Sequence, residues 1–368
     1  MSLTISIIRE ITPNEKRVAL VPESVKKLTD KGFKLLVEQG AGMNAHYPDS
    51  FYKESGAEIL EDPKQVLSRS QILLKVQPPT PEEINSIQPD SFIIGFLQYY
   101  KYPERVKMMA ERNINAFAIE LIPRITRSQS IDALSSQAAV AGYKAAIIAA
   151  NLSSRFFPML TTAAGTIRPS RVLVIGAGVA GLQAIATCRR LGAVVEAYDV
   201  RKAAKEEIQS LGARFLESPV VAEGAGGYAR ELTQEEKNAQ HTFMADNIAK
   251  SDIVITTAQV PGRKAPVIVT ADMVEKMRPS SVIVDIAAEN GGNCELTKPG
   301  ESVEHRGVLI YGPLNLPSTL PTHASEMYSK NLVNFLNLLT KDGKALDVDF
   351  NDEILQKSCI TYKGETKI

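Results

Sequence analysis

Apolar and polar residues alternate in short blocks along the first third of the chain, and the blocks predict strands and helices in turn. Apolar runs predict strands at Leu3–Ile8, Lys34–Glu38, Ile72–Val76, Phe92–Phe96 and Asn115–Ala118. The segments between them predict helices at Pro22–Lys31, Glu82–Ser86 and Pro103–Arg112. Strands that alternate with helices indicate a parallel sheet with helices on both faces.

The second half of the chain repeats this alternation. The alanine-rich stretch Ser135–Ser154 predicts a long helix that leaves the first lobe and enters the second. Further strands are predicted at Val172–Ile175, Val194–Tyr198, Ala213–Leu216, Ile253–Thr256, Val282–Ile286 and Val308–Tyr311. Apolar residues at helical spacing over Ala324–Leu339 predict a helix that packs back on the first lobe. A chain of 368 residues is long enough for two such domains.

We therefore predict an α/β fold with two Rossmann-like, doubly wound parallel-sheet domains and a cleft between them. Residues 1–134 and 322–368 are expected to form a discontinuous first lobe, and residues 135–321 the second. The cleft is the default ligand site.

The most informative segment is Val172–Arg201, which reads as strand, glycine turn, helix, strand and acid. Gly176, Gly178 and Gly181 form a G-x-G-x-x-G pattern with Val179 and Ala180 between the second and third glycines. The first glycine permits a tight turn, the second lets the backbone approach a pyrophosphate, and the third lets the helix pack on the strand. A pyrophosphate would sit at the helix N-terminus. The alternative is a tight strand–helix turn without a ligand.

Asp199 ends the next strand at the spacing expected of a carboxylate that accepts hydrogen bonds from an adenosine ribose. Val200 and Arg201 follow it and belong to the same predicted dinucleotide site. Arg201 raises the question of NADP, because an arginine there can hold a 2′-phosphate. The carboxylate would repel that phosphate, so we favour NAD. The alternative for Asp199 is a solvated acid at a strand end.

Composition limits the partners. The chain has 42 basic and 42 acidic residues and no basic stripe, which argues against nucleic acid and anionic membrane surfaces. Its three cysteines show no metal-ligand spacing and suit a reducing cytosol, so we expect no metal. Arg9 and Glu10 interrupt the first apolar run, and no apolar stretch is long enough to span a bilayer, so we expect neither a signal peptide nor a membrane helix.

Several segments resemble alanine dehydrogenases and proton-translocating nicotinamide nucleotide transhydrogenases. Asn14–Pro22 and the unit from Val174 to Asp199 are similar to signatures shared by both families. Pro123–Gln137 is more discriminating, since it resembles the nicotinamide-contacting loop of the NAD(H)-binding transhydrogenase component. Gly224–Glu231 and Ala288–Glu295 match that component as well. Two features depart from the first signature: Val21 stands where Ser or Thr is usual, and Arg9–Pro13 replaces an initial Gly-Pro.

The resemblance implies a specific function. That component binds NAD(H) and exchanges hydride with NADP(H) on a separate component, coupled to proton movement through a membrane component. The chain resembles the split form of the α subunit, so the resemblance implies a cytoplasmic homodimer at the inner membrane face, reached through partner subunits. By the same resemblance, Gln129 contacts the nicotinamide ribose or ring, and Arg124, Asp132 and Ser135 orient the carboxamide. A plainer interpretation is an exposed loop with Asp132 or Ser135 capping the next helix.

The polar stretch Ser218–Gln240 reads as an unusually long loop, and loops of that length are usually functional or disordered. Gly224, Gly226 and Gly227 give it flexibility, and Tyr228 offers a face to pack on a bound nucleotide. In the family, the matching loop closes over the nucleotide. The alternative is a disordered surface loop.

A second hypothesis is an NAD-dependent amino-acid dehydrogenase of the alanine dehydrogenase type. Lys75 and Arg17 match substrate-binding residues of those enzymes, although both can be retained scaffold. Gln98 falls where those enzymes carry a catalytic histidine, and glutamine cannot titrate. A third hypothesis is an NAD-sensing protein without catalysis.

Overall fold

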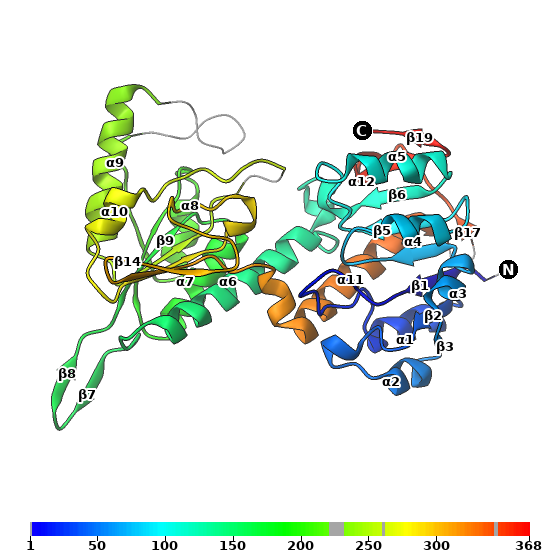
Figure 1. Ribbon diagram of the computed structural model, residues 1–368, viewed down its shortest axis with the longest axis horizontal. Coiled ribbons are helices and arrows are strands. Elements are labelled where there is room, and N and C mark those ends of the chain that lie inside the picture. The colour runs from blue at the N-terminus through cyan, green and yellow to red at the C-terminus, as the bar shows by residue number, and fades with distance from the viewer. Residues whose placement is uncertain (1, 221–231, 260–261, 342–344) are drawn as a thin grey trace. The chain divides into compact units, whose positions relative to one another are not determined.

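The computed structural model describes residues 2–220, 232–259, 262–341 and 345–368. It divides into two compact units, one formed by residues 1–137 and 317–368 and the other by residues 138–316 (Figure 1). The first unit therefore takes its residues from both ends of the chain. The change from one unit to the other falls within helix α6 (Ala133–Leu152).

The first unit is built on an eight-stranded sheet in the order β19-β18-β6-β5-β4-β1-β2-β3. Its strands are β1 (Thr4–Ile7), β2 (Lys34–Glu38), β3 (Glu58–Leu60), β4 (Ile72–Leu74), β5 (Phe92–Gly95), β6 (Asn115–Ala118), β18 (Cys359–Tyr362) and β19 (Glu365–Thr366). The six strands from β1 to β6 pair in parallel, whereas β18 pairs antiparallel with β6 and with β19. The helices are α1 (Pro22–Asp30), α2 (Asp49–Glu54), α3 (Pro63–Ser68), α4 (Pro81–Ser86), α5 (Pro103–Glu111), α11 (Pro321–Leu339) and α12 (Glu353–Ser358). A two-residue ribbon, β16 (Thr340–Lys341) with β17 (Ala345–Leu346), follows α11.

Both faces of the sheet are buried at its inner strands, which explains why β4 and β5 are apolar throughout. Ile72 and Leu74 enter the core that also holds residues of α1, α11 and α12. Leu73, between them, points into the opposite core, which α3, α4 and α5 cover. Successive strand residues face opposite sides of a sheet, so a doubly covered sheet needs an unbroken apolar run.

The second unit contains a seven-stranded sheet in the order β11-β10-β9-β12-β13-β15-β14, parallel except for the β14–β15 pair. Its strands are β9 (Arg171–Ile175), β10 (Val194–Tyr198), β11 (Arg214–Phe215), β12 (Ile253–Thr256), β13 (Val282–Asp285), β14 (Ser302–His305) and β15 (Val308–Tyr311). The helices are α7 (Val179–Arg190), α8 (Ala204–Ser210), α9 (Gln234–Ala249) and α10 (Ala271–Glu275). Strand order reverses between β9 and β12, and the crevice at such a reversal is where open α/β sheets bind ligands. The α/β fold with two Rossmann-like parallel-sheet domains is confirmed.

One prediction about this unit is wrong. The predicted loop Ser218–Gln240 ends earlier, because Gln234–Gln240 form the first turns of α9. Thr233 caps the helix by accepting a hydrogen bond from the Glu236 amide, and the Glu236 carboxylate accepts one from the Thr233 amide. This capping box outweighs the polar character of the segment. Tyr228 lies outside the described residues.

A β-hairpin in the second unit was not predicted. It consists of β7 (Leu160–Thr162) and β8 (Gly165–Ile167), both exposed along their whole length (Figure 1).

Among the described residues, no helix combines the length and apolar character needed to cross a bilayer.

Candidate functional site

The glycine turn, Gly176–Gly181, joins β9 to α7 in the geometry that the spacing predicts. Gly176 has a φ of +94°, which favours glycine, and its amide donates to the Tyr198 carbonyl at 2.8 Å. A Cβ atom on Gly181 would lie 1.9 Å from the Gly176 oxygen, so only glycine lets α7 start so close to β9. A Cβ on Gly178 would meet no described heavy atom within 4 Å. The space beside Gly178 is therefore open at the N-terminus of α7.

Gly142 of α6 has a packing role that the sequence did not indicate. A Cβ there would lie 2.0 Å from the carbonyl oxygen of Ala180. The backbone of α6 therefore packs against the first turn of α7, which begins at the exposed Val179. Because Ala180 lies in the predicted phosphate-binding turn, Gly142 helps to fix the position of that turn.

Asp199 directly follows β10, and its carboxylate accepts four hydrogen bonds. Two come from backbone amides, of Ala177 at 2.7 Å and of Arg201 at 2.8 Å. The other two come from the Arg201 guanidinium, with Nε 3.0 Å from Oδ1 and Nη2 3.1 Å from Oδ2. The guanidinium therefore compensates the charge of the carboxylate, and repulsion by Asp199 alone does not decide between NAD and NADP.

Asp285 is a functional candidate that sequence reasoning missed. It ends β13, is fully buried, and accepts five hydrogen bonds of 2.7–3.1 Å. The donors are three backbone amides and two hydroxyls, from Thr256, Ala287, Asn293, Cys294 and Thr297. This carboxylate therefore shapes the loop that follows β13 at the carboxyl end of the sheet. In the sequence, the only signal is an acid that ends a wholly apolar strand.

Asn293 links the loop after β13 to the loop after β12 by hydrogen bonds. Its side-chain amide donates to the carbonyls of Ala258 and Pro266, both at 2.8 Å, and its side-chain oxygen accepts from the Ala258 amide at 2.9 Å. The neighbouring Thr257 hydroxyl donates to the Gly176 carbonyl at 3.0 Å. The loops after β9, β12 and β13 are thus joined by hydrogen bonds at one edge of the sheet.

The four polar residues predicted near the nicotinamide are not all in mutual contact. Asp132 caps α6 by accepting from the Ser135 amide at 2.9 Å, and it also accepts from the Ser135 hydroxyl at 2.6 Å. Arg124 and Gln129 are exposed, and neither side chain bonds to a described residue. The structure therefore supports the capping interpretation for Asp132, whereas the side chains of Arg124 and Gln129 stabilise no described element through hydrogen bonds.

Arg17 lies in a buried ion pair in the first unit. Its guanidinium donates to both carboxylate oxygens of Glu15, at 2.8 and 2.6 Å, and to the side chain of Gln137 at 2.8 Å. Burial alone would raise the pKa of Glu15, but the hydrogen bonds and charge of Arg17 outweigh it and hold that pKa at about 2. Arg17 is thus already engaged with a carboxylate of its own unit.

Lys75 is buried in the same way. Its ammonium lies 3.2 Å from a carboxylate oxygen of Glu10 and 3.2 Å from one of Glu83. Burial favours the neutral amine, yet the two carboxylates outweigh this effect and raise the pKa of Lys75. Lys75 therefore remains charged and paired.

Gln98 adopts a left-handed backbone conformation with a φ of +46° at the turn after β5. The Glu120 carboxylate holds this turn by accepting from the amides of Leu97 at 3.1 Å and Gln98 at 2.5 Å. Burial raises the pKa of Glu120 to about 7, against the opposing effect of these hydrogen bonds. The Gln98 side chain donates to Gln77, which in turn donates to Glu15. Gln98 thus ends a hydrogen-bonded series of polar side chains that contains no histidine.

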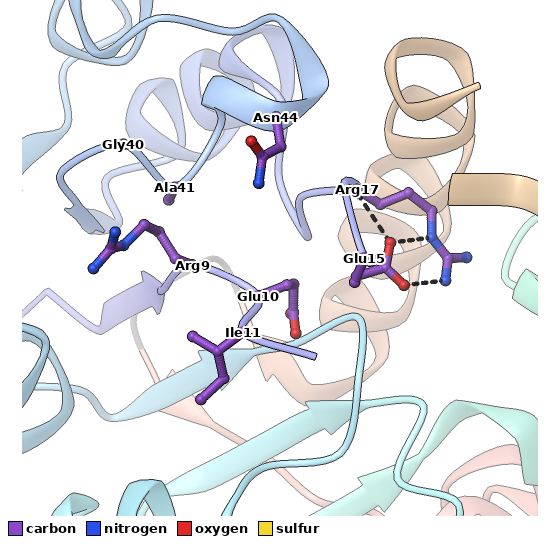
Figure 2. Close-up of a pocket in the computed structure, with 8 residues that line it drawn as sticks. All are labelled: Arg9, Glu10, Ile11, Glu15, Arg17, Gly40, Ala41 and Asn44. Carbon is purple, nitrogen blue, oxygen red and sulfur yellow. Dashed lines mark hydrogen bonds and ion pairs between the residues drawn. The ribbon is translucent and has the colours of Figure 1, made fainter. Parts of the chain in front are cut away.

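A pocket of about 180 Å³ opens beside these charges within the first unit (Figure 2). Its lining residues are Arg9, Glu10, Ile11, Glu15, Arg17, Gly40, Ala41 and Asn44. Figure 2 shows Glu15 and Arg17 joined to each other along one side of it. The pocket wall therefore presents ion pairs that are satisfied within the protein.

Comparison with known proteins assigns the chain to a protein family. The model of the alanine dehydrogenase/PNT N-terminal domain matches residues 6–141, and that of the C-terminal domain matches residues 145–368. The chain belongs to the alanine dehydrogenase/PNT family. These two matches cover nearly all of it, as the resemblance of its motifs predicts.

Within this family, the chain is more similar to transhydrogenases than to alanine dehydrogenases. It is 46% identical to the first part of NAD(P) transhydrogenase subunit alpha of Rhodospirillum rubrum, over 98% of this chain and 97% of that protein. The crystal structure of transhydrogenase from Sinorhizobium meliloti superposes with a TM-score of 0.89 at 44% identity, over 99% of both chains. Alanine dehydrogenase of Bacillus subtilis is 31% identical, over 87% of this chain and 81% of that protein.

Proposed function

We propose that this chain is the NAD(H)-binding α subunit of an NAD(P) transhydrogenase. It exchanges hydride between NAD(H) on its own second unit and NADP(H) on a partner component, and a membrane component couples the exchange to proton translocation. The similarity to the Rhodospirillum rubrum subunit supports this assignment. The observation that carries it is a dinucleotide-binding turn with the predicted backbone geometry, in a chain whose Arg17 and Lys75 are paired with buried carboxylates and whose position 98 is a glutamine.

The nucleotide half of the proposal rests on the turn and on Asp199. Gly178 leaves open space at the N-terminus of α7, where free amides and the helix dipole favour a pyrophosphate. We propose that Gly176–Gly181 hold the pyrophosphate and that Asp199 holds the adenosine ribose, with Val200 and the backbone amide of Arg201 beside it. NAD(H) is favoured because both of its ribose hydroxyls can donate to the carboxylate, whereas a 2′-phosphate removes one donor.

Hydride exchange between two nicotinamide rings requires that the rings be held in position, and it requires no general acid or base. When bound, the nicotinamide supplies the hydride chemistry, and the protein holds the ring where a second ring can approach. We propose that the exposed Arg124 and Gln129 contact the nicotinamide end of the dinucleotide, because neither side chain bonds to a described residue. Asp132 and Ser135 would act from the first turn of α6.

The amino-acid dehydrogenase alternative requires a cation for the substrate carboxylate and a group that accepts a proton as hydride leaves. Arg17 and Lys75 are each neutralised by buried carboxylates, and breaking either pair would leave buried charge without compensation. Position 98 holds a glutamine, which does not titrate. We therefore expect no NADH formation from L-alanine, and turnover well above background would restore this alternative.

The central test is single-turnover hydride transfer from deuterated NADPH on the NADP(H)-binding component to an oxidised NAD analogue on this chain. We expect direct transfer of the label and a rate of the isotope-sensitive step that is nearly flat with pH around neutrality. Loss of deuterium to solvent, or a bell-shaped pH profile, would show that a protein acid or base takes part. Absence of transfer together with NADH binding would favour an NAD-sensing protein.

Gln129→Asn tests the positioning role. Because misplacing a reacting ring by about 1 Å can slow a reaction on the order of a hundredfold, the variant should slow transfer far more than it weakens NADH binding. Gln356→Asn shortens an exposed glutamine elsewhere in the same unit and serves as the matched control. Equal effects of the two variants on transfer would remove Gln129 from the site.

We also propose that the chain is a homodimer and acts at the cytoplasmic face of a membrane through its partner subunits. The β7–β8 hairpin and the segment that leads into it support self-association, since Phe156, Met159 and Ile167 are 53%, 64% and 47% exposed. An isolated two-stranded hairpin is marginal in water, so its exposed apolar side chains need a cover. Sedimentation should give a dimer for the unmutated chain and a monomer for Met159→Lys with Ile167→Lys. An unchanged dimer would place the interface elsewhere.

A further inference from the structure

Arg201 occupies the positions on Asp199 that a ribose would need. A carboxylate offers about four acceptor sites, and all four are used here. The amides of Ala177 and Arg201 take two of them and belong to the fixed backbone of the turn. The remaining two receive Nε and Nη2 of the Arg201 side chain, one on each oxygen. A ribose that donates two hydrogen bonds to this carboxylate therefore competes with the guanidinium for the same acceptor sites.

The guanidinium edge and the ribose present the same pattern of donors. Each offers two adjacent donors, N–H groups in one case and a cis pair of hydroxyls in the other, to the two oxygens of one carboxylate. Arg201 also donates to the Ala177 carbonyl at 3.1 Å, which holds its side chain over the turn. It is the more exposed member of the pair, with 36% of its side chain accessible against 7% for Asp199. The arginine can therefore swing into solvent, whereas the aspartate is fixed.

We infer that Arg201 is an internal competitor for the adenosine ribose, which lowers the affinity for NAD(H) and limits the discrimination against NADP(H). This inference rests on the proposed function, since it concerns the same site. When NADH binds, its two ribose hydroxyls take over the acceptor positions of Nε and Nη2, and the guanidinium moves out. Two backbone amides keep the carboxylate in place during the exchange.

Two consequences distinguish this role from that of an ordinary cofactor contact. Removing the side chain should tighten NADH binding, because the ribose no longer displaces an ion pair. It should also weaken NADPH binding, because the 2′-phosphate then meets a carboxylate whose charge is no longer compensated. An arginine that contacted the bound nucleotide would give the opposite result for NADH, and an arginine that held a 2′-phosphate would affect NADPH alone.

The experiment measures NADH and NADPH affinities by calorimetry for the unmutated chain, Arg201→Ala and Arg201→Lys. A partly exposed ion pair contributes up to about 1 kcal/mol, so we expect Arg201→Ala to bind NADH about two- to fivefold more tightly and NADPH more weakly. Arg201→Lys keeps the charge without the two-pronged edge and should fall between. The difference in NADH affinity between Arg201→Ala and the unmutated chain should shrink in high salt, which screens the ion pair.

Arg214→Ala is the matched control, because it removes an arginine that is 76% exposed and paired with a carboxylate, Glu196, in the same unit. It should leave the ratio of NADH to NADPH affinity unchanged. Thermal unfolding of each variant shows whether the fold is retained, and Arg201→Lys tests the inference if Arg201→Ala does not fold. Unchanged or weaker NADH binding by both folded variants would overturn the inference while the proposed function stands. Failure of the unmutated chain to bind NADH would overturn the proposed function itself.

Discussion

Replacing Asp285 by asparagine should destabilise the second unit, because five donors converge on its buried carboxylate. The new amide group is best tolerated at the Oδ1 position, where the Thr256 hydroxyl can rotate and accept from it. The Ala287 amide then has no acceptor, and one such buried donor costs about 1–3 kcal/mol. The three donors at the other oxygen also face a neutral acceptor in place of a charged one. We expect a total loss of about 2–4 kcal/mol.

Scanning calorimetry measures this loss, and the transition of the second unit is the one that NADH shifts upward. At roughly 2–4 °C per kcal/mol for a unit of this size, Asp285→Asn should lower that transition by about 4–16 °C. Asp285→Ala removes both oxygens, so it should cost more than about 4 kcal/mol. Asp246→Asn changes an exposed aspartate of α9 and serves as the control, with an expected effect within about 0.5 kcal/mol. If Asp285→Asn behaves like this control, the carboxylate does not hold the loop.

Three further predictions test other parts of the structure. Gly178→Ala should fold with an unchanged melting temperature yet lose NADH binding, whereas Gly181→Ala should unfold at a lower temperature, because its Cβ would lie 1.9 Å from a backbone oxygen. Calorimetry and titration with NADH separate the two variants, and identical behaviour would contradict the assigned roles. Burial raises the pKa of Glu120 to about 7 from a usual 4.5, so the stability it contributes is complete below about pH 4.5 and is lost as the pH rises through 7. Urea unfolding of Glu120→Gln between about pH 5 and 8 should therefore show a flatter pH dependence than the unmutated chain, and parallel curves would refute this. Lys75→Met should destabilise the first unit by about 3–5 kcal/mol in urea, because it strands two buried carboxylates; a neutral effect would mean that they take up protons instead.

The parallel core of each sheet could be predicted because buried strands and amphipathic helices leave local signatures. The elements that were missed lack such signatures. Strand β3 is short and only partly buried, and helix α9 buries only Met244, Ala245 and Ile248, so its polar first half resembled a loop. The spacing of Thr233 and Glu236 is that of a capping box, and it is a local signal for the start of α9. The antiparallel pairing of β18 with β6 joins residues far apart in sequence, and no local pattern encodes that pairing.

The candidate site was predictable to the same extent. Glycines at fixed spacing and an acid at the end of the next strand report backbone geometry, and that geometry is local. Asp285 and Asn293 differ because their partners come from several separate loops, and a buried aspartate looks like a solvated one in the sequence. The Arg201 side chain on Asp199 was missed for a similar reason, since the sequence shows that the two charges are near and not which atoms they occupy.

The assembly of the first unit from both ends of the chain has a consequence for synthesis on the ribosome. Strand β6 lies inside the finished sheet, but its outer neighbour β18 is translated only after the whole of the second unit. Until then β6 is an edge with unpaired amides and carbonyls, the kind of surface on which other chains add strands. The second unit, continuous in sequence, can complete its core while the first still waits for β18. Release of a chain shortened before Cys359 would leave this edge permanently open, so premature termination there is expected to produce aggregation rather than a merely weakened enzyme.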